Sequence, residues 1–355
     1  MSKTHTGYAF PSQGAKLTAV QVPTPAVGPD DVLVRVVYVS PTPLDVWQGH
    51  FGLAAEYPLV PADNLYGVAA EVGEHVKHVA KGDKVLSFTF GPNEGRGSQQ
   101  YALIPANRIA KLPANVDPVA AVTVPTNLVT VFHTITADLG LDIIRDASGK
   151  PLDLPADVKS KRILVWGGSS SVGQYAIQLL ALSGYTNVIT ASSARHHADL
   201  LALGASRAVD YTAPTVLEDV GGPVDYVLDA IGDRQETIAK YSPLARPGAR
   251  VAILLPIRYG GRAANNVGSE LDEGAFAPGV HVRLVRTHFY EKNEWFRDHL
   301  QPELLPALLE KGLIKPNKIR VVEGSTPLER LQNAIDSLAN GAVSGEKLVV
   351  RIGED

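Results

Sequence analysis

The chain has 355 residues, a hydrophobic content of 45%, a formal net charge of −4 at pH 7 and no cysteine. Its length predicts two domains, and its slightly acidic charge gives no reason to expect a nucleic acid or an anionic membrane as a partner. The absence of cysteine excludes disulfides, cysteine nucleophiles and thiolate zinc sites.

The first part of the chain is predicted to be β-rich. Its N-terminus is polar and no apolar run reaches the length of a membrane span, so we expect a cytoplasmic protein without a secretory signal. Residues 31–40 alternate and are rich in β-branched side chains, and short apolar segments follow at 67–73, 82–90 and 99–105. Strands at this spacing predict a small barrel or sandwich. From about residue 118 the apolar residues recur at helical spacing.

From residue 162 onward, strands and helices alternate, beginning with RILVWGG and SVGQYAIQLLALSG. Six short apolar strands separated by helices predict a parallel, doubly wound sheet that is covered on both faces. The remaining residues hold two amphipathic helices and a last strand, EKLVVRI, which we expect to rejoin the N-terminal domain. The predicted α/β chain therefore has a β-rich domain of residues 1–125 and 286–355, and a Rossmann domain of residues 126–285.

The segment WGGSSSVGQ lies between the first strand and the first helix of the predicted Rossmann domain. In register with the dinucleotide fingerprint G-x-G-x-x-G, its three glycine positions hold Gly168, Ser170 and Gly173. Gly168 is expected to allow the tight turn, and Gly173 to let the helix pack closely on the strand. Serine departs from the rule at the second position, but its hydroxyl could donate to a phosphate oxygen beside the helix N-terminus. The alternative is a turn in which serine merely caps the helix.

The end of the second Rossmann strand indicates which nucleotide is bound. NAD sites usually carry an acid there, yet VITASSARHH contains none, and the first acid is Asp199, inside the next helix. Ser192, Ser193 and Arg195 stand where a 2′-phosphate would lie, and hydroxyls with a guanidinium suit a dianion. We therefore expect NADPH; the alternative is that Arg195 and His196 only face solvent.

The order of domains and the returning tail resemble the medium-chain dehydrogenase/reductases over nearly the whole chain. WGGSSSVGQYAIQLL, SPTPLDVW and SGEKLVVRI resemble the zinc-independent quinone oxidoreductase and enoyl reductase branch, most of all the fungal ToxD-like and trans-acting polyketide enoyl reductases. The resemblance implies that the N-terminal domain is a GroES-like catalytic domain.

The resemblance also bears on zinc. Zinc-dependent members carry G-H-E-x-x-G-x-V, where this chain has ADNLYGVA, with Asp63 at the histidine position and Asn64 at the glutamate position. With cysteine absent as well, both family zinc sites are expected to be lost. Without that Lewis acid the expected reaction is hydride delivery to an activated C=C bond instead of alcohol–carbonyl interconversion.

Further cofactor contacts follow from the resemblance and from the sheet. The resemblance implies that Thr130 lies by the nicotinamide, Tyr211 near the adenosine phosphate, and Gly345 with Lys347 over the cofactor, although Lys347 could equally be a surface charge. Ile231, Gly232, Leu254 and Leu255 lie at strand C-terminal ends, where such sheets bind ligands. The predicted cofactor-binding residues are Gly168, Ser169, Ser170, Ser171, Val172, Gly173, Ser192, Ser193, Arg195, Tyr211, Ile231, Gly232, Leu254, Leu255, Gly345 and Lys347.

The substrate side is predicted from the family segment N-P-x-D-x-K. Pro43 and Asp45 match it, whereas Trp47 replaces the lysine and suggests an apolar or aromatic pocket wall; a core tryptophan is the alternative. Tyr66 or Tyr290 could donate a proton or a hydrogen bond to a developing enolate, with core packing as the alternative. The predicted catalytic residues are Tyr66, Tyr290 and Thr130, the predicted pocket residues are Pro43, Asp45 and Trp47, and no metal is expected.

The expected function is NADPH-dependent, metal-free reduction of the C=C bond of an α,β-unsaturated carbonyl compound. The alternatives are NADPH:quinone oxidoreduction, and a non-catalytic NADPH-binding sensor or partner subunit. The expected partner is a small enone, enal or acyl thioester, and the chain is expected to be a monomer or homodimer. A carrier protein could dock on Lys311, Lys315, Lys318 and Arg320, although a solvated turn is the preferred explanation of that cluster.

Overall fold

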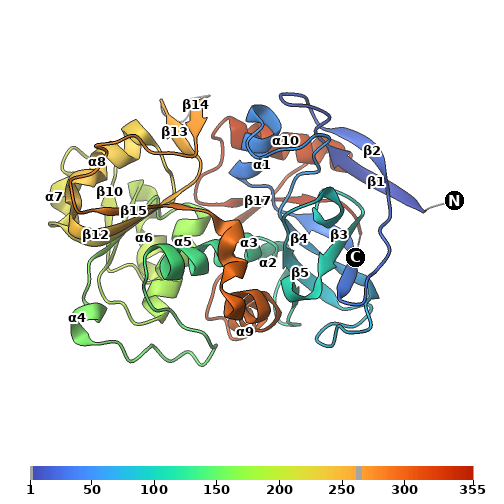
Figure 1. Ribbon diagram of the computed structural model, residues 1–355, viewed down its shortest axis with the longest axis horizontal. Coiled ribbons are helices and arrows are strands. Elements are labelled where there is room, and N and C mark those ends of the chain that lie inside the picture. The colour runs from blue at the N-terminus through green and yellow to red at the C-terminus, as the bar shows by residue number, and fades with distance from the viewer. Residues whose placement is uncertain (1–2, 261–265, 355) are drawn as a thin grey trace. The chain divides into compact units, whose positions relative to one another are not determined.

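A computed structural model of the chain describes residues 3–260 and 266–354. The chain forms two compact units (Figure 1): a first unit of Met1–Val129 with Glu291–Asp355, and a second unit of Thr130–Tyr290. The sequence predicts these divisions at 125/126 and 285/286.

A seven-stranded sheet organises the first unit, with strand order β16-β17-β3-β4-β5-β7 and β6 paired to β3. Its strands are β3 (Asp31–Val39), β4 (Asn64–Val72), β5 (Lys84–Phe88), β6 (Tyr101–Pro105), β7 (Ile109–Lys111), β16 (Ile319–Val321) and β17 (Lys347–Arg351). A separate antiparallel pair is made by β1 (Thr4–Ala9) and β2 (Thr18–Pro23). The expected C-terminal strand is β17, which pairs antiparallel with β3 and so carries the tail into this sheet.

Helices accompany this sheet in the first unit. They are α1 (Pro43–Phe51), α2 (Pro118–Ala121), α9 (Leu305–Glu310) and α10 (Pro327–Ala339). In α10, Thr326 caps the N-terminus by accepting from Glu329 N, and the buried Leu331, Ala334 and Ile335 recur at helical spacing. These side chains join the same core as the buried valines of β3.

A six-stranded sheet organises the second unit, with strand order β10-β9-β8-β11-β12-β15 and every pair parallel. Its strands are β8 (Ile163–Trp166), β9 (Val188–Ser192), β10 (Arg207–Asp210), β11 (Val224–Asp229), β12 (Ala245–Leu254) and β15 (His281–Val285). The predicted doubly wound parallel sheet is confirmed. The strand order reverses between β8 and β11, and this switch point is where such sheets open a crevice for ligands.

The remaining elements of the second unit connect these strands. The helices are α4 (Ala156–Lys159), α5 (Ser171–Leu182), α6 (His197–Ala202), α7 (Val216–Val220) and α8 (Ala239–Tyr241), and α3 (Pro125–His133) leads into the unit. An antiparallel pair, β13 (Ile257–Tyr259) with β14 (Asn266–Gly268), is a feature that the sequence did not predict.

One helical stretch, Pro118–Asp138, is long and apolar enough to cross a membrane by length and composition alone. Of its most apolar window, 78% is buried inside the protein. Because a core helix passes the same test, this stretch is weak evidence for a membrane span.

Candidate active site

The junction of β8 and α5 places two glycine backbones against their neighbours. The left-handed turn residue is Gly167, with φ of 81°, so the prediction that Gly168 makes the tight turn is wrong. Gly168 is needed for close approach instead, because a Cβ there would lie 1.7 Å from Thr190 Oγ1 on β9. The N–H groups of Gly167 and Gly168 both donate to Ala191 O, at 3.0 and 3.1 Å, which fixes the loop on the second strand.

The first turn of α5 packs tightly against this loop. A Cβ on Gly173 would lie 2.4 Å from Gly167 O, so the predicted role of Gly173 in close helix–strand packing is confirmed. Ser170 caps α5, since its Oγ accepts from Gly173 N at 3.1 Å. The capping alternative therefore describes the local structure, although a capping hydroxyl can still donate its own hydrogen. Ser169, Ser171 and Val172 are half-buried around the helix N-terminus.

The end of β9 presents the residues predicted to select the nucleotide. Ser192 is buried and its Oγ donates to Ser193 O at 3.3 Å, while Ser193 is half-buried. Arg195 is exposed on the short turn Ala194–His196, and its Nε lies 3.2 Å from His196 Nε2. The guanidinium of Arg195 therefore lies just after β9, at the edge of the sheet that also carries the phosphate loop.

A buried carboxylate that sequence reasoning missed fixes the turn after β11. Asp229 is fully buried and accepts from the N–H groups of Ile231 and Gly232 at 2.8 and 3.1 Å. The hydroxyls of Thr237 and Tyr241 also donate to it, both at 3.0 Å. Burial raises the pKa of Asp229, against the effect of these hydrogen bonds. An acid at the end of the buried segment VDYVLD is the signal that could have found it.

The other predicted residues of the second unit lie as follows. Ile231 is half-buried after β11, the strand next to β8, and Leu254 and Leu255 are half-buried at the end of β12, the following strand in the sheet. Tyr211 is half-buried after β10, with the Lys240 ammonium 5.8 Å from its ring centroid. Thr130 is 5% exposed and its Oγ1 accepts from Thr287 Oγ1 at 3.1 Å. The ends of β8, β9, β11 and β12 meet at one edge of the sheet, because neighbouring parallel strands end together.

In the first unit, Asp45 ties α1 to the segment before β4. Its Oδ2 accepts from the N–H and hydroxyl of Thr42, at 2.7 and 3.2 Å, and its Oδ1 accepts from Ala62 N at 2.7 Å. The side chain is buried and these bonds confirm the turn-fixing role considered for Asp45, while its place in a substrate pocket stays a prediction. Pro43 is exposed at the start of the helix.

The residues at the family's zinc-motif positions are engaged by protein groups. Asp63 is buried and its Oδ1 accepts from Arg96 Nη1 at 3.2 Å, while Arg96 also donates to Gln48 Oε1 at 3.2 Å. Asn64 Oδ1 accepts from the N–H and hydroxyl of Thr126, at 2.9 and 2.7 Å. Over the residues that the structure describes, no group of three or more histidine and carboxylate side chains could hold a metal ion.

Lys347 joins this buried cluster. It is 6% exposed, so the alternative of a surface charge is wrong. Burial lowers the pKa of Lys347 to about 8, against the opposing charges of Asp45 and Asp63. Gly345, two residues earlier, is half-buried with φ of 72°.

The aromatic residues predicted for catalysis are more deeply buried than the one predicted for the pocket. Tyr66 and Tyr290 are both 0% exposed, and the Tyr66 ring stacks on Tyr38 with centroids 6.0 Å apart. Both rings lie in the core, which agrees with the packing alternative, and their assignment as proton donors stays a prediction. Trp47 is half-buried on α1, with its ring 5.3 Å from that of Phe51, and its place in a pocket wall stays a prediction.

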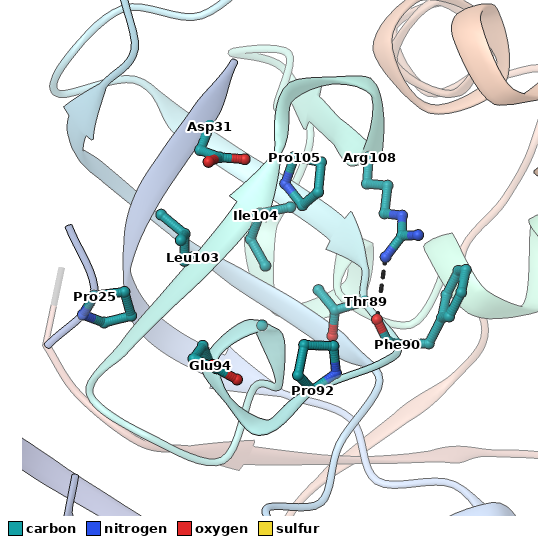
Figure 2. A pocket seen from close by; sticks show the side chains of 11 residues that line it. Pro25, Asp31, Thr89, Phe90, Pro92, Glu94, Leu103, Ile104, Pro105 and Arg108 are labelled. Carbon is teal, nitrogen blue, oxygen red and sulfur yellow. Dashed lines mark hydrogen bonds between the residues drawn. The ribbon is translucent and has the colours of Figure 1, made fainter. Parts of the chain in front are cut away.

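A cavity of about 280 Å³ opens elsewhere in the first unit (Figure 2), and no predicted site residue lines it. Figure 2 shows Arg108 at its wall, donating to Phe90 O at 3.1 Å. The same guanidinium makes two further bonds to Glu291, at 2.8 and 3.1 Å. The positive charge of Arg108 is thus already neutralised within the protein.

Stability should depend on pH through Asp63. Burial raises the pKa of Asp63 from an ordinary 3.8 to about 7, against the effect of Arg96. Between these values the folded chain holds a proton that the unfolded chain releases, so the stability from this group is complete below pH 3.8 and is lost as pH rises through about 7. Asp63→Asn should therefore make the free energy of unfolding fall less steeply over this range, measured by denaturant titration at several pH values.

The control for this prediction is Asp298→Asn in the same unit. Arg297 lowers the pKa of Asp298 by a hydrogen bond, so this carboxyl is ionised in the folded and the unfolded chain over the same pH range, and its substitution should leave the slope there unchanged. Equal slopes for the wild-type chain and Asp63→Asn would contradict the prediction.

Comparisons with known proteins agree with this architecture. The family model described as alcohol dehydrogenase GroES-like domain matches residues 28–114, and the one described as zinc-binding dehydrogenase matches residues 171–255. The trans-enoyl reductase himH of Aspergillus japonicus is 31% identical, over 91% of this chain and 90% of its own. The trans-enoyl reductase tndF of Aspergillus flavipes is 30% identical, over 99% and 100%.

Among solved structures, the CurK enoyl reductase has a similar fold, with a TM-score of 0.74 at 17% identity over 99% of this chain and 100% of its own. The similarity to these two relatives at 30% identity or more extends over almost the whole chain and therefore over both units. The chain therefore belongs to the medium-chain dehydrogenase/reductase superfamily, in its enoyl reductase branch, and is an oxidoreductase that uses a nicotinamide cofactor.

Proposed function

We propose that this protein is an NADPH-dependent reductase of the C=C bond of α,β-unsaturated carbonyl compounds. The observation that carries the proposal is similarity to trans-enoyl reductases along almost the whole chain, at 30% identity over 99% of it in one case. The phosphate loop of the second unit supports binding of NADPH. The residues at the zinc-motif positions of the first unit support reduction of a C=C bond over reduction of a carbonyl group.

The residues at the switch point fit a dinucleotide. Gly168 and Gly173 leave no room for a Cβ, so the loop lies close to β9 and α5, and the first N–H groups of α5 can face a pyrophosphate. The N-terminus of the 12-residue helix α5 adds partial positive charge. Ser192, Ser193 and Arg195 would hold the 2′-phosphate, and the turn fixed by Asp229 would border the nicotinamide end. NADPH, when bound, supplies the hydride.

The first unit supports C=C reduction over carbonyl reduction. Carbonyl reduction by zinc relatives needs a Lewis acid, whereas Asp63 is engaged by Arg96 and Asn64 by Thr126. When hydride adds to a β-carbon, the negative charge moves to the carbonyl oxygen of the substrate. Hydrogen-bond donors placed before the reaction can stabilise that charge, so orientation and electrostatics would supply most of the rate.

Arg195 should select NADPH over NADH. Arg195→Ala is expected to weaken NADPH binding by about tenfold to a hundredfold, because it removes a charge-assisted contact to the 2′-phosphate, and to leave NADH binding nearly unchanged. Arg207→Ala is a matched control, since Arg207 is also exposed but begins β10 at the opposite end of the strand. Fluorescence titration with both nucleotides measures the effect, and equal losses for NADH and NADPH would refute this role.

The function itself is tested with a substrate panel. Purified full-length protein and NADPH are incubated with enones, enals, saturated aldehydes and quinones, and products are identified by mass spectrometry. The proposal expects saturated ketones and aldehydes from the enones and enals. Turnover of quinones without any C=C product would establish the quinone reductase alternative, and NADPH binding without consumption would establish the sensor.

A further inference from the structure

The cavity of the first unit lies between two fixed segments. One is the turn Asn93–Gly95, and the other is β6. Asn93 anchors the turn, because its Oδ1 accepts from Val60 N at 2.9 Å and its Nδ2 donates to Pro58 O at 2.7 Å. All residues of β6 pair antiparallel with β3. Both walls are therefore held by the protein itself, and the cavity of about 280 Å³ is already formed for a ligand, as small-molecule sites usually are.

The wall of this cavity is mostly apolar, and all of it belongs to the first unit. The apolar side chains that line it are Pro25, Phe90, Pro92, Leu103, Ile104 and Pro105. A ligand body that packs on them is removed from water, which is the main favourable contribution to binding of apolar groups. The volume lies just below the range of about 300–1,000 Å³ that is typical of small-molecule sites, so the expected ligand has about one ring and a short side chain.

Two carboxylates of the lining have no partner within the described protein. Asp31 is half-buried at the start of β3, and Glu94 is exposed on the turn. Within the part of the chain that the structure describes, neither side chain makes a hydrogen bond or an ion pair. The third charged side chain of the lining, Arg108, is already paired with Glu291 at 2.8 and 3.1 Å. The cavity therefore presents unbalanced negative charge, which attracts a cation and repels an anion.

A buried hydroxyl adds a second polar feature to the lining. Thr89 directly follows β5, is 2% exposed, and its N–H donates to Asp63 O at 2.7 Å. Its Oγ1 is buried and has no hydrogen-bond partner among the described residues. Figure 2 shows Thr89 between Ile104 and Pro92, with Oγ1 directed toward Pro92, which also lines the cavity. Because nearly all buried hydroxyls in proteins are paired and an unpaired one is costly, a ligand that bonds to this hydroxyl gains affinity.

We propose that this cavity is a binding site for a small organic amine. The ammonium group of the ligand pairs with the carboxylate of Asp31 or Glu94. The apolar body of the ligand lies against Leu103 and Ile104, and a polar atom of the ligand is hydrogen-bonded to Thr89 Oγ1. The site goes beyond the proposed function, because none of these residues is assigned there to the nucleotide or to the reacting carbons.

The charge of the ligand separates this site from a nonspecific apolar cavity. Three probes that share one carbon skeleton differ in charge at neutral pH: 2-phenylethylamine is a cation, 2-phenylethanol is neutral and phenylacetate is an anion. Affinity should fall in that order, because an ion pair that is partly shielded from water adds to apolar packing, whereas a further negative charge opposes binding. Isothermal titration calorimetry with the full-length protein measures each Kd, and the Kd of the amine is expected to lie below about 1 mM.

Substitutions test the two polar parts of the site. The double variant Asp31→Asn/Glu94→Gln removes both charges at nearly constant shape, so it should weaken amine binding by about tenfold and abolish the preference for the amine over the alcohol. Thr89→Val should weaken amine binding by about threefold to tenfold, whereas Thr89→Ser keeps the hydroxyl and should bind the amine more tightly than Thr89→Val does. The matched control is Glu71→Gln, which neutralises an exposed acid on β4 of the same sheet and should match the wild-type protein.

The order of the three probes is measured on the wild-type protein, so the test stays decisive if a variant does not fold, as its Tm would show. An amine that binds no more tightly than the alcohol or phenylacetate, or an amine Kd that is unchanged in the double variant, would overturn the assignment. The absence of binding of all three probes would overturn it too. Because the titrations contain neither NADPH nor an enone, these outcomes leave the proposed function intact, whereas a wild-type protein that forms no C=C reduction product overturns the function itself.

Discussion

Gly173→Ala is expected to weaken NADPH binding by about tenfold to a hundredfold. The added Cβ would lie 2.4 Å from Gly167 O and 2.7 Å from Gly168 Cα, both backbone atoms of the phosphate loop. Backbone atoms cannot move aside as a flexible side chain can, so the loop must shift away from the helix. Overpacking of this kind costs about 1–3 kcal/mol, and each 1.4 kcal/mol is tenfold in affinity. Titration of nucleotide fluorescence measures the change in Kd.

The matched control is Gly268→Ala in the same unit. A Cβ on Gly268 would meet its nearest neighbour at 3.5 Å, an ordinary van der Waals contact, so NADPH binding should not change. An unchanged Kd in Gly173→Ala would show that the loop does not hold the pyrophosphate in the manner described.

Asp229→Ala should lower the stability of the second unit by roughly 3 kcal/mol or more. The substitution removes the acceptor for Ile231 N, Gly232 N and the Tyr241 hydroxyl, and each buried donor left unsatisfied costs about 1–3 kcal/mol. For a unit of this size the expected decrease in Tm is about 6 to 12 °C. Differential scanning calorimetry measures it, and NADPH affinity should fall too because the turn at Ile231 loses its anchor.

Asp272→Ala provides the comparison for this substitution. Asp272 is half exposed and pairs with Arg234 at 2.7 Å, a surface contact worth less than about 1 kcal/mol. A similar Tm for the two variants would mean that the Asp229 network does not stabilise the unit.

The parallel sheet could be predicted from the sequence because local patterns determine it. Short β-branched segments that alternate with helical segments are compatible with few folds other than a doubly wound sheet. The six strands of the sheet are those expected from the sequence. The phosphate loop was recognisable for the same reason, since strand, loop and helix are contiguous. The sequence did not show which glycine has which role. Gly167 has the left-handed backbone, and Gly168 allows close packing of the loop against β9.

The buried charge cluster could not be predicted, because its members come together only through long-range packing. Asp45, Asp63, Arg96 and Lys347 belong to four separate segments, and each alone looks like an ordinary polar residue of a turn or a strand end. Arg96 in particular lies in GPNEGRGSQQ, which has the composition of an exposed loop. The burial of Tyr66 and Tyr290 could not be predicted for a related reason, since a ring in a packed core leaves no periodic signal in the sequence.

The position of the transferred hydrogen tests the central claim most directly. Full-length protein is given an enone and NADPH that carries deuterium at the transferred position, and the product is analysed by NMR. The account predicts a saturated ketone with deuterium on the β-carbon and a proton from water on the α-carbon. Deuterium on a carbinol carbon, or consumption of NADPH only with quinones, would contradict it.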